Sequence, residues 1–232
     1  KMTMVFEGTP QEFGMDGYLK SNLDIAKDVI QKDWDMMFCV DGMERSGKSV
    51  FAMQCAYYCD NEFDLTKVCF TPYQFKKAIT NAKPFSSILY DEAFTGLSSR
   101  ATMSLINRTI VQVLAEIGQK NLFIFVVMPT FFDLDKYVGL WRTRGLFHIR
   151  TAENFQRGFF DFYNSDKKKE LYVNGKKFYN YRAVQPNFSG RFPNKYMIDE
   201  KEYRILKKKS LLNRENSRED KELDRLAEKK LM

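Results

Sequence analysis

The sequence offers little material for a metal site or a disulfide framework. It holds a single histidine, His148, and four cysteines whose spacing matches no paired metal-ligand motif: Cys39, Cys55, Cys59 and Cys69. We therefore expect buried free thiols, which are usual in a reducing cytosol, and a cytoplasmic location.

Long apolar runs are also missing. No stretch approaches the ~20 uninterrupted apolar residues that a membrane helix needs, and the first residues show no secretory-signal pattern. We expect no membrane span. With 232 residues, of which 44% are hydrophobic, the chain can instead bury the core of one large domain.

An excess of charge is confined to the last third of the chain. Residues 1–156 hold 17 Lys and Arg against 18 Asp and Glu, a net charge of −1. Residues 157–195 hold 9 against 3, and residues 196–232 hold 11 against 9. This asymmetry predicts a polyanionic partner for one face, although a solvated basic surface that aids solubility is the alternative.

Alternating strand and helix patterns over residues 35–150 predict an α/β fold with a mostly parallel sheet between helices. Strands are expected at residues 35–40, 67–70, 87–90, 121–128 and 146–150. Helices are expected at residues 21–32 (with Ser21 as N-cap), 48–58, 72–83, 103–118 and 133–142. Residues 1–19 carry several glycines and are expected to be loosely structured.

The pattern changes after residue 157. Strands are expected at 159–163, 171–173 and 177–181, with Asn174 and Gly175 as the tight turn of a β-hairpin. We therefore divide the chain into an N-terminal segment and helix (1–34), a core (35–156), a basic aromatic β-hairpin extension (157–198) and a charged helical tail (199–232).

A phosphate-binding motif follows the first strand of the core. The residues from Gly42 to Ser49 read GMERSGKS and match the pattern GxxxxGK[ST] at every fixed position. Such glycines let backbone N–H groups turn inward around phosphates, Lys48 reaches the β- and γ-phosphates, and Ser49 offers its hydroxyl to Mg²⁺. The alternative is an ordinary glycine-rich turn. We predict ATP and Mg²⁺ as cofactors, with a nucleotide site made of Gly42, Met43, Glu44, Arg45, Ser46, Gly47, Lys48, Ser49 and Val50.

An acidic pair ends the strand expected at 87–90. Asp91 is in position to hold Mg²⁺, and Glu92 is in position to polarise a water for attack on the γ-phosphate. A pair that only caps the strand end is the alternative. An activated water argues against nucleotide kinases, which use a hydroxyl of a second substrate.

Together these motifs resemble the additional-strand, catalytic-glutamate class of P-loop NTPases. Within that class, Asp91-Glu92-Ala93, Arg100 and residues 121–135 are similar to the FtsK/HerA translocases and to the zonular occludens toxin-like ATPases of filamentous phages. Viral DNA-packaging motors of the terminase type are more distant. The resemblance covers residues 35–150 and implies a RecA-like core, ATP hydrolysis and assembly into a ring.

The resemblance also implies roles for residues outside the two motifs. Thr130 occupies the position that senses the γ-phosphate, where those families often carry Gln or Asn. An arginine of one subunit completes the site of the next, and the candidates are Arg100, Arg108, Arg142 and Arg144. We favour Arg142 or Arg144, with compensation of a helix C-terminus as the alternative role.

Eleven aromatic residues lie among nine Lys and Arg in residues 157–196. This mixture predicts contact with nucleic acid, whereas packing of a hairpin on the core is the alternative. We expect most of the aromatics to pack and the lysines around the hairpin to be exposed: Lys167, Lys168, Lys169, Lys176 and Lys177.

The combined interpretation is an ATP-hydrolysing motor that translocates or packages DNA, expected to be double-stranded, as a homo-oligomeric ring. Such a motor would fit a virus or a phage. The alternatives are an export or assembly ATPase that acts on protein, and a slow nucleotide-regulated switch or scaffold.

Overall fold

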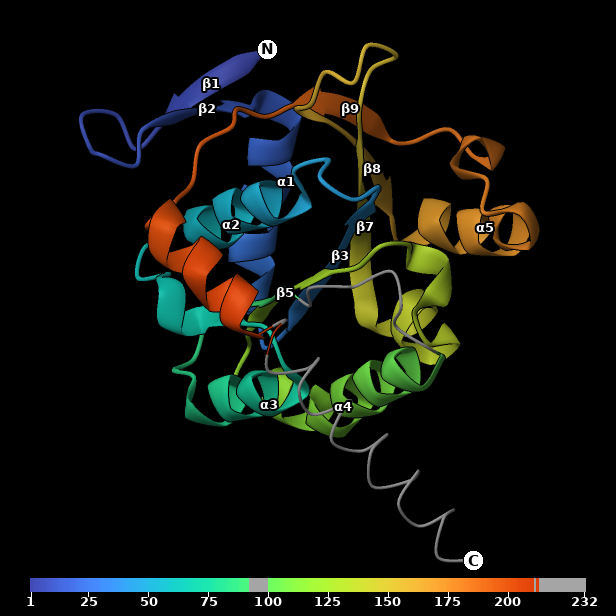
Figure 1. Ribbon diagram of the computed structural model, residues 1–232, viewed down its shortest axis with the longest axis horizontal. Helices are drawn as coiled ribbons and strands as arrows, with labels where there is room; N and C mark the ends of the chain where they lie inside the picture. Colours follow the sequence, from blue (N-terminus) through green and yellow to red (C-terminus); the bar gives the residue numbers. More distant parts are fainter. Residues whose placement is uncertain (92–99, 211, 213–232) are drawn as a thin grey trace, which may run out of the picture.

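A computed structural model gives the structure of the chain (Figure 1) and describes residues 1–91, 100–210 and 212. Its centre is a seven-stranded sheet with the strand order β4-β5-β6-β3-β7-β8-β9. The first five strands of this order are parallel to their neighbours, and β8 and β9 are antiparallel. The strands are β3 (Met36–Gly42), β4 (Val68–Cys69), β5 (Ser87–Asp91), β6 (Phe123–Val127), β7 (Thr143–Arg150), β8 (Phe159–Asn164) and β9 (Phe188–Arg191).

Helices cover both faces of the sheet (Figure 1). The helices α1 (Gly17–Ile30) and α2 (Lys48–Cys59) pack on one face, and α3 (Pro72–Asn81) and α4 (Arg100–Gln119) pack on the other. Each face of the sheet therefore has its own hydrophobic core: the first core lies under α1 and α2, and the second core lies under α3 and α4. Because successive side chains of a strand point to opposite faces, Phe38 and Val40 belong to the first core and Met37 and Cys39 to the second. The predicted α/β layering is confirmed.

The elements predicted over residues 35–128 are found within a few residues of the expected positions. Of the helix expected at 133–142, residues 136–142 are helical, mostly as the π-helical stretch η3 (Val138–Arg142), and the start of the range is the end of a short turn, η2 (Phe131–Asp133). All four cysteines are buried and free, as expected, and burial raises the pKa of Cys69 to about 12. In the described part of the chain, no helix has the length and apolar character to span a membrane.

The expectation of a loosely structured N-terminus is wrong. Residues 1–16 form an antiparallel hairpin of β1 (Met2–Val5) and β2 (Phe13–Asp16), which buries Val5, Phe13 and Met15 against the first core. The next helix begins at Gly17 rather than after Ser21, because the Asp16 carboxylate accepts hydrogen bonds from the N–H groups of Tyr18 and Leu19.

The predicted turn at Asn174-Gly175 is also wrong. Residues 165–175 form the helix α5 (Ser165–Gly175), followed by the short turns η4 (Lys176–Phe178) and η5 (Tyr181–Ala183). The Asn164 side chain caps α5 by accepting from the N–H of Lys167, and Leu171 and Tyr172 face the second core. The strands β8 and β9 therefore extend the main sheet, and a helix joins them in place of a tight hairpin.

Candidate functional site

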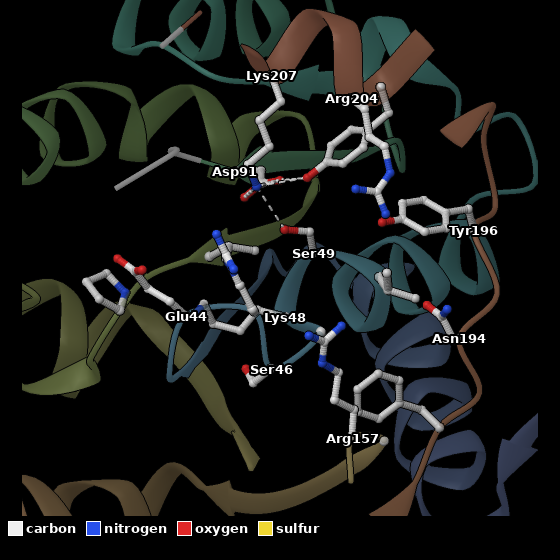
Figure 2. Close-up of a pocket in the computed structure, with 18 of the residues that line it drawn as sticks. Glu44, Ser46, Lys48, Ser49, Asp91, Arg157, Asn194, Tyr196, Arg204 and Lys207 are labelled. Carbon is white, nitrogen blue, oxygen red and sulfur yellow. Dashed lines mark hydrogen bonds and ion pairs between the residues drawn. The ribbon is translucent and has the colours of Figure 1, made fainter. Parts of the chain in front are cut away.

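A cleft of about 1120 Å³ opens at the carboxyl ends of β3, β5 and β6 (Figure 2). One wall is the loop between β3 and α2 together with the first residues of α2, from Glu44 to Val50. The other walls come from Asp91, from residues 127–129 after β6, from the turn between β7 and β8, and from residues 192–208. All of the predicted nucleotide-binding residues line this cleft except Gly42 and Met43 at the base of the loop.

The two fixed glycines of the loop are required by its backbone. Gly42 has φ +138°, and a Cβ there would lie 2.1 Å from the carbonyl oxygen of Ile149 on β7. Gly47 has φ +102°, and a Cβ there would lie 3.2 Å from the ring of Phe192. At Gly42 a side chain would overlap backbone atoms, and at Gly47 it would be strained by the positive φ and would crowd the ring of Phe192.

The N-terminus of α2 lines the cleft and has features that suit an anion. The helix begins at Lys48, its N-cap is Gly47 without a side-chain cap, and its first turn has no acidic residue. The first N–H groups of the helix are therefore free to bind an anion, and the helix dipole favours one. Ser46 adds a hydroxyl that is buried, with 1% exposed, and has no hydrogen-bond partner among the described residues.

Lys48 lies folded against the loop. Its Nζ donates to the carbonyl oxygens of Gly42 and Met43, both at 2.6 Å. Burial lowers the pKa of Lys48, and the nearby Asp41 and Asp91 carboxylates oppose that shift. The ammonium group is therefore held within the loop that would surround the phosphates.

Ser49 at the start of α2 and Asp91 at the end of β5, the predicted Mg²⁺ ligands, are brought together, although β6 separates β5 from β3, the strand before the loop. Lys207 Nζ lies 3.2 Å from Ser49 Oγ and 3.0 Å from Asp91 Oδ2, so both oxygens contact one cation (Figure 2). Tyr203 also donates its hydroxyl to Asp91 Oδ2 at 2.5 Å. A hydroxyl and a carboxylate next to a phosphate site are suitable ligands for Mg²⁺, which usually binds one or two carboxylates plus substrate phosphates.

The residues predicted only from the resemblance lie elsewhere. The Thr130 hydroxyl accepts from the N–H of Phe132 and is 2.8 Å from the hydroxyl of Tyr181, so it is engaged beside the cleft wall. Arg142 and Arg144 lie 3.3 and 3.8 Å from Asp35 Oδ1, at the opposite end of the sheet. They lie there because β7 begins at residue 143 and runs parallel to β3. Glu92 and the side chain of Arg100 lie outside the described residues.

The sequence analysis missed a buried network behind the loop. Asp41, the residue before Gly42, is fully buried and accepts hydrogen bonds from the N–H of Phe131 at 2.6 Å and from the hydroxyl of Tyr181. His148 Nδ1 lies 2.8 Å from Asp41 Oδ1, and its ring stacks on Tyr181 with 3.7 Å between centroids. Burial raises the pKa of Tyr181, so its hydroxyl stays protonated and can donate. The network connects β3 and β7 with the turns η2 and η5.

The sequence analysis also missed most of the far wall of the cleft. Tyr203 and Lys207 belong to a helix over residues 200–210, where no motif marks them as site residues. Other cleft residues of this kind are Phe155, Arg157, Asn194, Tyr196 and Arg204. The excess of basic charge in the last third of the chain predicted a polyanionic partner for one face but did not single out these residues.

The predicted exposure of the lysines at 167–177 is only partly confirmed. Lys168 is fully buried and donates to the carbonyl oxygens of Gly139 and Leu140 at 2.8 and 2.9 Å, so its predicted exposure is wrong. Burial lowers its pKa to about 8. Lys176 and Lys177 are exposed, as expected. The expected packing of aromatics is confirmed for Phe160, Phe162, Tyr163, Tyr172 and Phe192.

Comparison with known proteins adds no relative. No family model, curated protein or solved structure matches this chain at a significant level.

Proposed function

We propose that the chain is a Mg²⁺-dependent ATPase of the P-loop class. One observation carries the proposal: a loop with the phosphate-binding pattern lies at a strand–helix junction, and its Ser49 shares a cation with the strand-end carboxylate of Asp91. The strand order supports the proposal, because β6 lies between β3 and β5 as the additional strand of the class requires. This order is compatible with a RecA-like core.

In this proposal the loop amides and the N-terminus of α2 bind the phosphates, and Lys48 adds a positive charge. A Mg²⁺ ion held by Ser49 and Asp91 would neutralise charge on the β- and γ-phosphates. Water attacks the γ-phosphorus, the bond to the bridging oxygen breaks, and Glu92 accepts the proton of the water. The Asp41 network keeps the loop in place during this step.

Two variants test the chemistry. Lys48→Ala should weaken binding of a fluorescent ATP analogue, because the charge inside the loop is lost. Glu92→Gln should bind the analogue as tightly as the wild type but fail to release phosphate, since an amide cannot accept the proton. Lys201→Ala, an exposed change on the helix at 200–210, is the control and should change neither quantity. If the wild type binds no nucleotide, or if Glu92→Gln hydrolyses ATP at the wild-type rate, the mechanism fails.

We further propose that hydrolysis drives movement of DNA. The supporting surface is the loop of residues 176–182, which exposes the basic residues Lys176, Lys177 and Arg182 next to Phe178, 75% exposed, and Tyr179, 55% exposed. Basic groups can neutralise phosphates, and exposed aromatic faces can stack on bases. Tyr181 in the same loop bonds to Asp41 and Thr130, so the loop is connected to the phosphate-loop strand.

ATP turnover measured without DNA, with double-stranded DNA and with single-stranded DNA tests this second step. We expect double-stranded DNA to stimulate turnover. Turnover that no DNA changes would contradict DNA translocation and favour an ATPase that moves protein.

A further inference from the structure

The ammonium of Lys207 occupies the position between the two predicted Mg²⁺ ligands. Its Nζ is 3.2 Å from Ser49 Oγ, and 3.2 and 3.0 Å from the two carboxylate oxygens of Asp91 (Figure 2). Tyr203, one helical turn earlier, donates to the same carboxylate. A divalent cation cannot bind these oxygens while an ammonium group contacts all three of them, because the two cations would repel each other at close range.

We propose that the helix of residues 200–210 is an autoinhibitory latch on the metal site, and that Lys207 and Tyr203 must leave Asp91 before a Mg²⁺–nucleotide complex binds. This inference rests on the proposed ATPase function and adds a regulatory step to it. It predicts that the Mg²⁺ concentration, rather than the nucleotide concentration alone, controls access to the site.

Within residues 200–210, the helix is buried at Tyr203 and half-buried only at Lys207 and Ser210. Tyr203 is buried, with its ring centroid 5.7 Å from that of Phe70 and 5.8 Å from that of Tyr196. Lys207 is half-buried, whereas most of the helix is exposed: Glu200, Lys201, Glu202, Arg204, Ile205, Leu206, Lys208 and Lys209. A helix with so few buried groups can detach at low cost in free energy.

The segment before the helix is fastened independently of the cleft. Gln54 on α2 donates its side-chain amide to the carbonyl oxygens of Pro193 and Lys195, at 2.8 and 2.9 Å. Met197 is buried in the first core. Release of Tyr203 and Lys207 therefore leaves the chain anchored up to residue 197, so that the helix can swing away and return.

The Asp91 carboxylate needs a cation beside it whether the helix of residues 200–210 is closed over the cleft or open. Asp91 is 1% exposed, and a buried carboxylate is costly unless a cation or hydrogen-bond donors face it. Lys207 and Tyr203 supply both in the closed state, and Mg²⁺ would supply the charge in the open state. The latch is thus an exchange of one cation for another on a single carboxylate.

Removal of the Lys207 ammonium changes nucleotide binding in opposite directions if Lys207 is a latch or if it is a phosphate ligand. If Lys207 helped to bind phosphates, its removal would weaken nucleotide binding at every Mg²⁺ concentration. If Lys207 blocks the metal site, its removal lowers the Mg²⁺ concentration at which nucleotide binds. Lys207→Met removes the charge and keeps the aliphatic chain, and Tyr203→Phe removes the hydroxyl and keeps the ring packing. Lys209→Met is the matched control, because Lys209 is an exposed lysine of the same helix.

The experiment titrates the full chain, at a fixed concentration of a fluorescent ADP analogue, with Mg²⁺. Lys207→Met should lower the half-saturating Mg²⁺ concentration about tenfold, the ratio expected if the wild-type latch is open about one tenth of the time. Tyr203→Phe should shift it in the same direction, and Lys209→Met should match the wild type. An unchanged or higher half-saturating concentration in Lys207→Met overturns the latch.

Hydrogen exchange on the wild type gives a second readout that needs no variant. Amide protection of residues 200–210 should fall when Mg²⁺ and ADP are added together, but not when either is added alone. Equal or greater protection with both overturns the latch while leaving the ATPase proposal intact. Failure of every protein to bind the analogue at any Mg²⁺ concentration would instead overturn the proposed function, so the two failures are distinguishable.

Discussion

At the scale of single residues, the phosphate loop depends on a glycine that two independent constraints require. Gly42 combines φ +138° with a carbonyl oxygen of β7 only 2.1 Å from the place of a Cβ. Gly8 in the N-terminal turn also has a positive φ, of +75°, but a Cβ there would meet no atom within 4 Å. A substitution at Gly8 therefore measures the cost of the positive φ alone, whereas one at Gly42 measures that cost plus the cost of steric overlap.

We expect Gly8→Ala to reduce the free energy of unfolding by about 1 kcal/mol, the cost of a positive φ for a residue with a Cβ. Gly42→Ala should reduce it by more and should also abolish nucleotide binding, because the loop must move away from Ile149. Urea unfolding and binding of a fluorescent ATP analogue measure the two effects. Equal losses of stability in the two variants would contradict the steric argument.

Lys168 allows a prediction on pH. Its pKa is lowered to about 8 in the folded chain from the ordinary lysine value of 10.5, because burial disfavours the charged form. Between these values the unfolded chain binds more protons than the folded chain, so raising the pH through this range favours folding at this residue.

A comparison with Lys168→Met isolates this contribution from the buried tyrosines and cysteines, whose raised pKa values act in the opposite direction. From pH 7 to pH 9, the stability of the wild type should rise relative to that of Lys168→Met by about 1 kcal/mol. Urea unfolding of both proteins at each pH measures the difference. A difference that stays constant over this range would show that Lys168 does not titrate there.

At the scale of elements, the sequence predicted strands and helices best where a short motif or a regular apolar pattern marks the element. The phosphate loop requires glycines, a lysine and a hydroxyl at fixed spacing, so the motif predicted the strand, loop and helix from β3 to α2. The amphipathic pattern of residues 103–118 likewise predicted most of α4. These elements carry their signals within a few residues.

Elements that depend on distant contacts were not predictable in this way. Asn174-Gly175 is typical of a hairpin turn, yet the cap by Asn164 and packing of Leu171 on the second core favour a helix there. Lys207 contacts Asp91 across 116 positions of sequence, and no local pattern marks such a contact. For the same reason the sequence placed Lys168 on the surface, although the carbonyl groups of η3 hold it inside.

The corrected positions of the lysines redirect the DNA prediction to the loop of residues 176–182. Replacing Lys176, Lys177 and Arg182 by Ala should lower DNA affinity and reduce the log–log salt slope by up to about three, at ~0.9 per phosphate contact on duplex DNA. Titrations of labelled duplex at several salt concentrations measure the slope. Basal ATP turnover should persist, since these side chains lie outside the cleft.

A triple variant of Lys76, Lys77 and Lys83 is the control, because it removes the same charge from exposed positions on and just after α3. It should leave the salt slope close to that of the wild type. If the wild type and both triple variants have the same salt slope, the loop of residues 176–182 does not contact DNA. If both triple variants lower the slope by the same amount, DNA is attracted by the net charge of the protein and not by this loop.

At the scale of the whole molecule, the arginines proposed to act on a neighbouring subunit lie far from the cleft of their own subunit. Arg142 and Arg144 both pair with Asp35, and the guanidinium of Arg144 also stacks on Trp34 at 4.8 Å. Trp34, which precedes Asp35, is 49% exposed, and Trp141, which precedes Arg142, is 63% exposed. Arg144 is the more informative position to mutate, because its side chain is more exposed than that of Arg142 and its distance to Asp35 is longer.

If a ring forms and Arg144 completes the site of the next subunit, two inactive variants should restore activity when mixed. Lys48→Ala keeps the arginine but loses its own phosphate site, and Arg144→Ala keeps the phosphate site but loses the arginine. With random assembly, about a quarter of the sites in an equimolar mixture join an intact loop to an intact arginine of the neighbour. ATP turnover should therefore rise to about that fraction of the wild-type rate.

A mixture of Lys48→Ala with Glu92→Gln is the control. It should stay inactive, because each of these changes damages the site of the subunit that carries it, so every site in the mixture is defective. An Arg144→Ala protein that is active by itself, or a first mixture as inactive as the control, would exclude this arginine from a shared site.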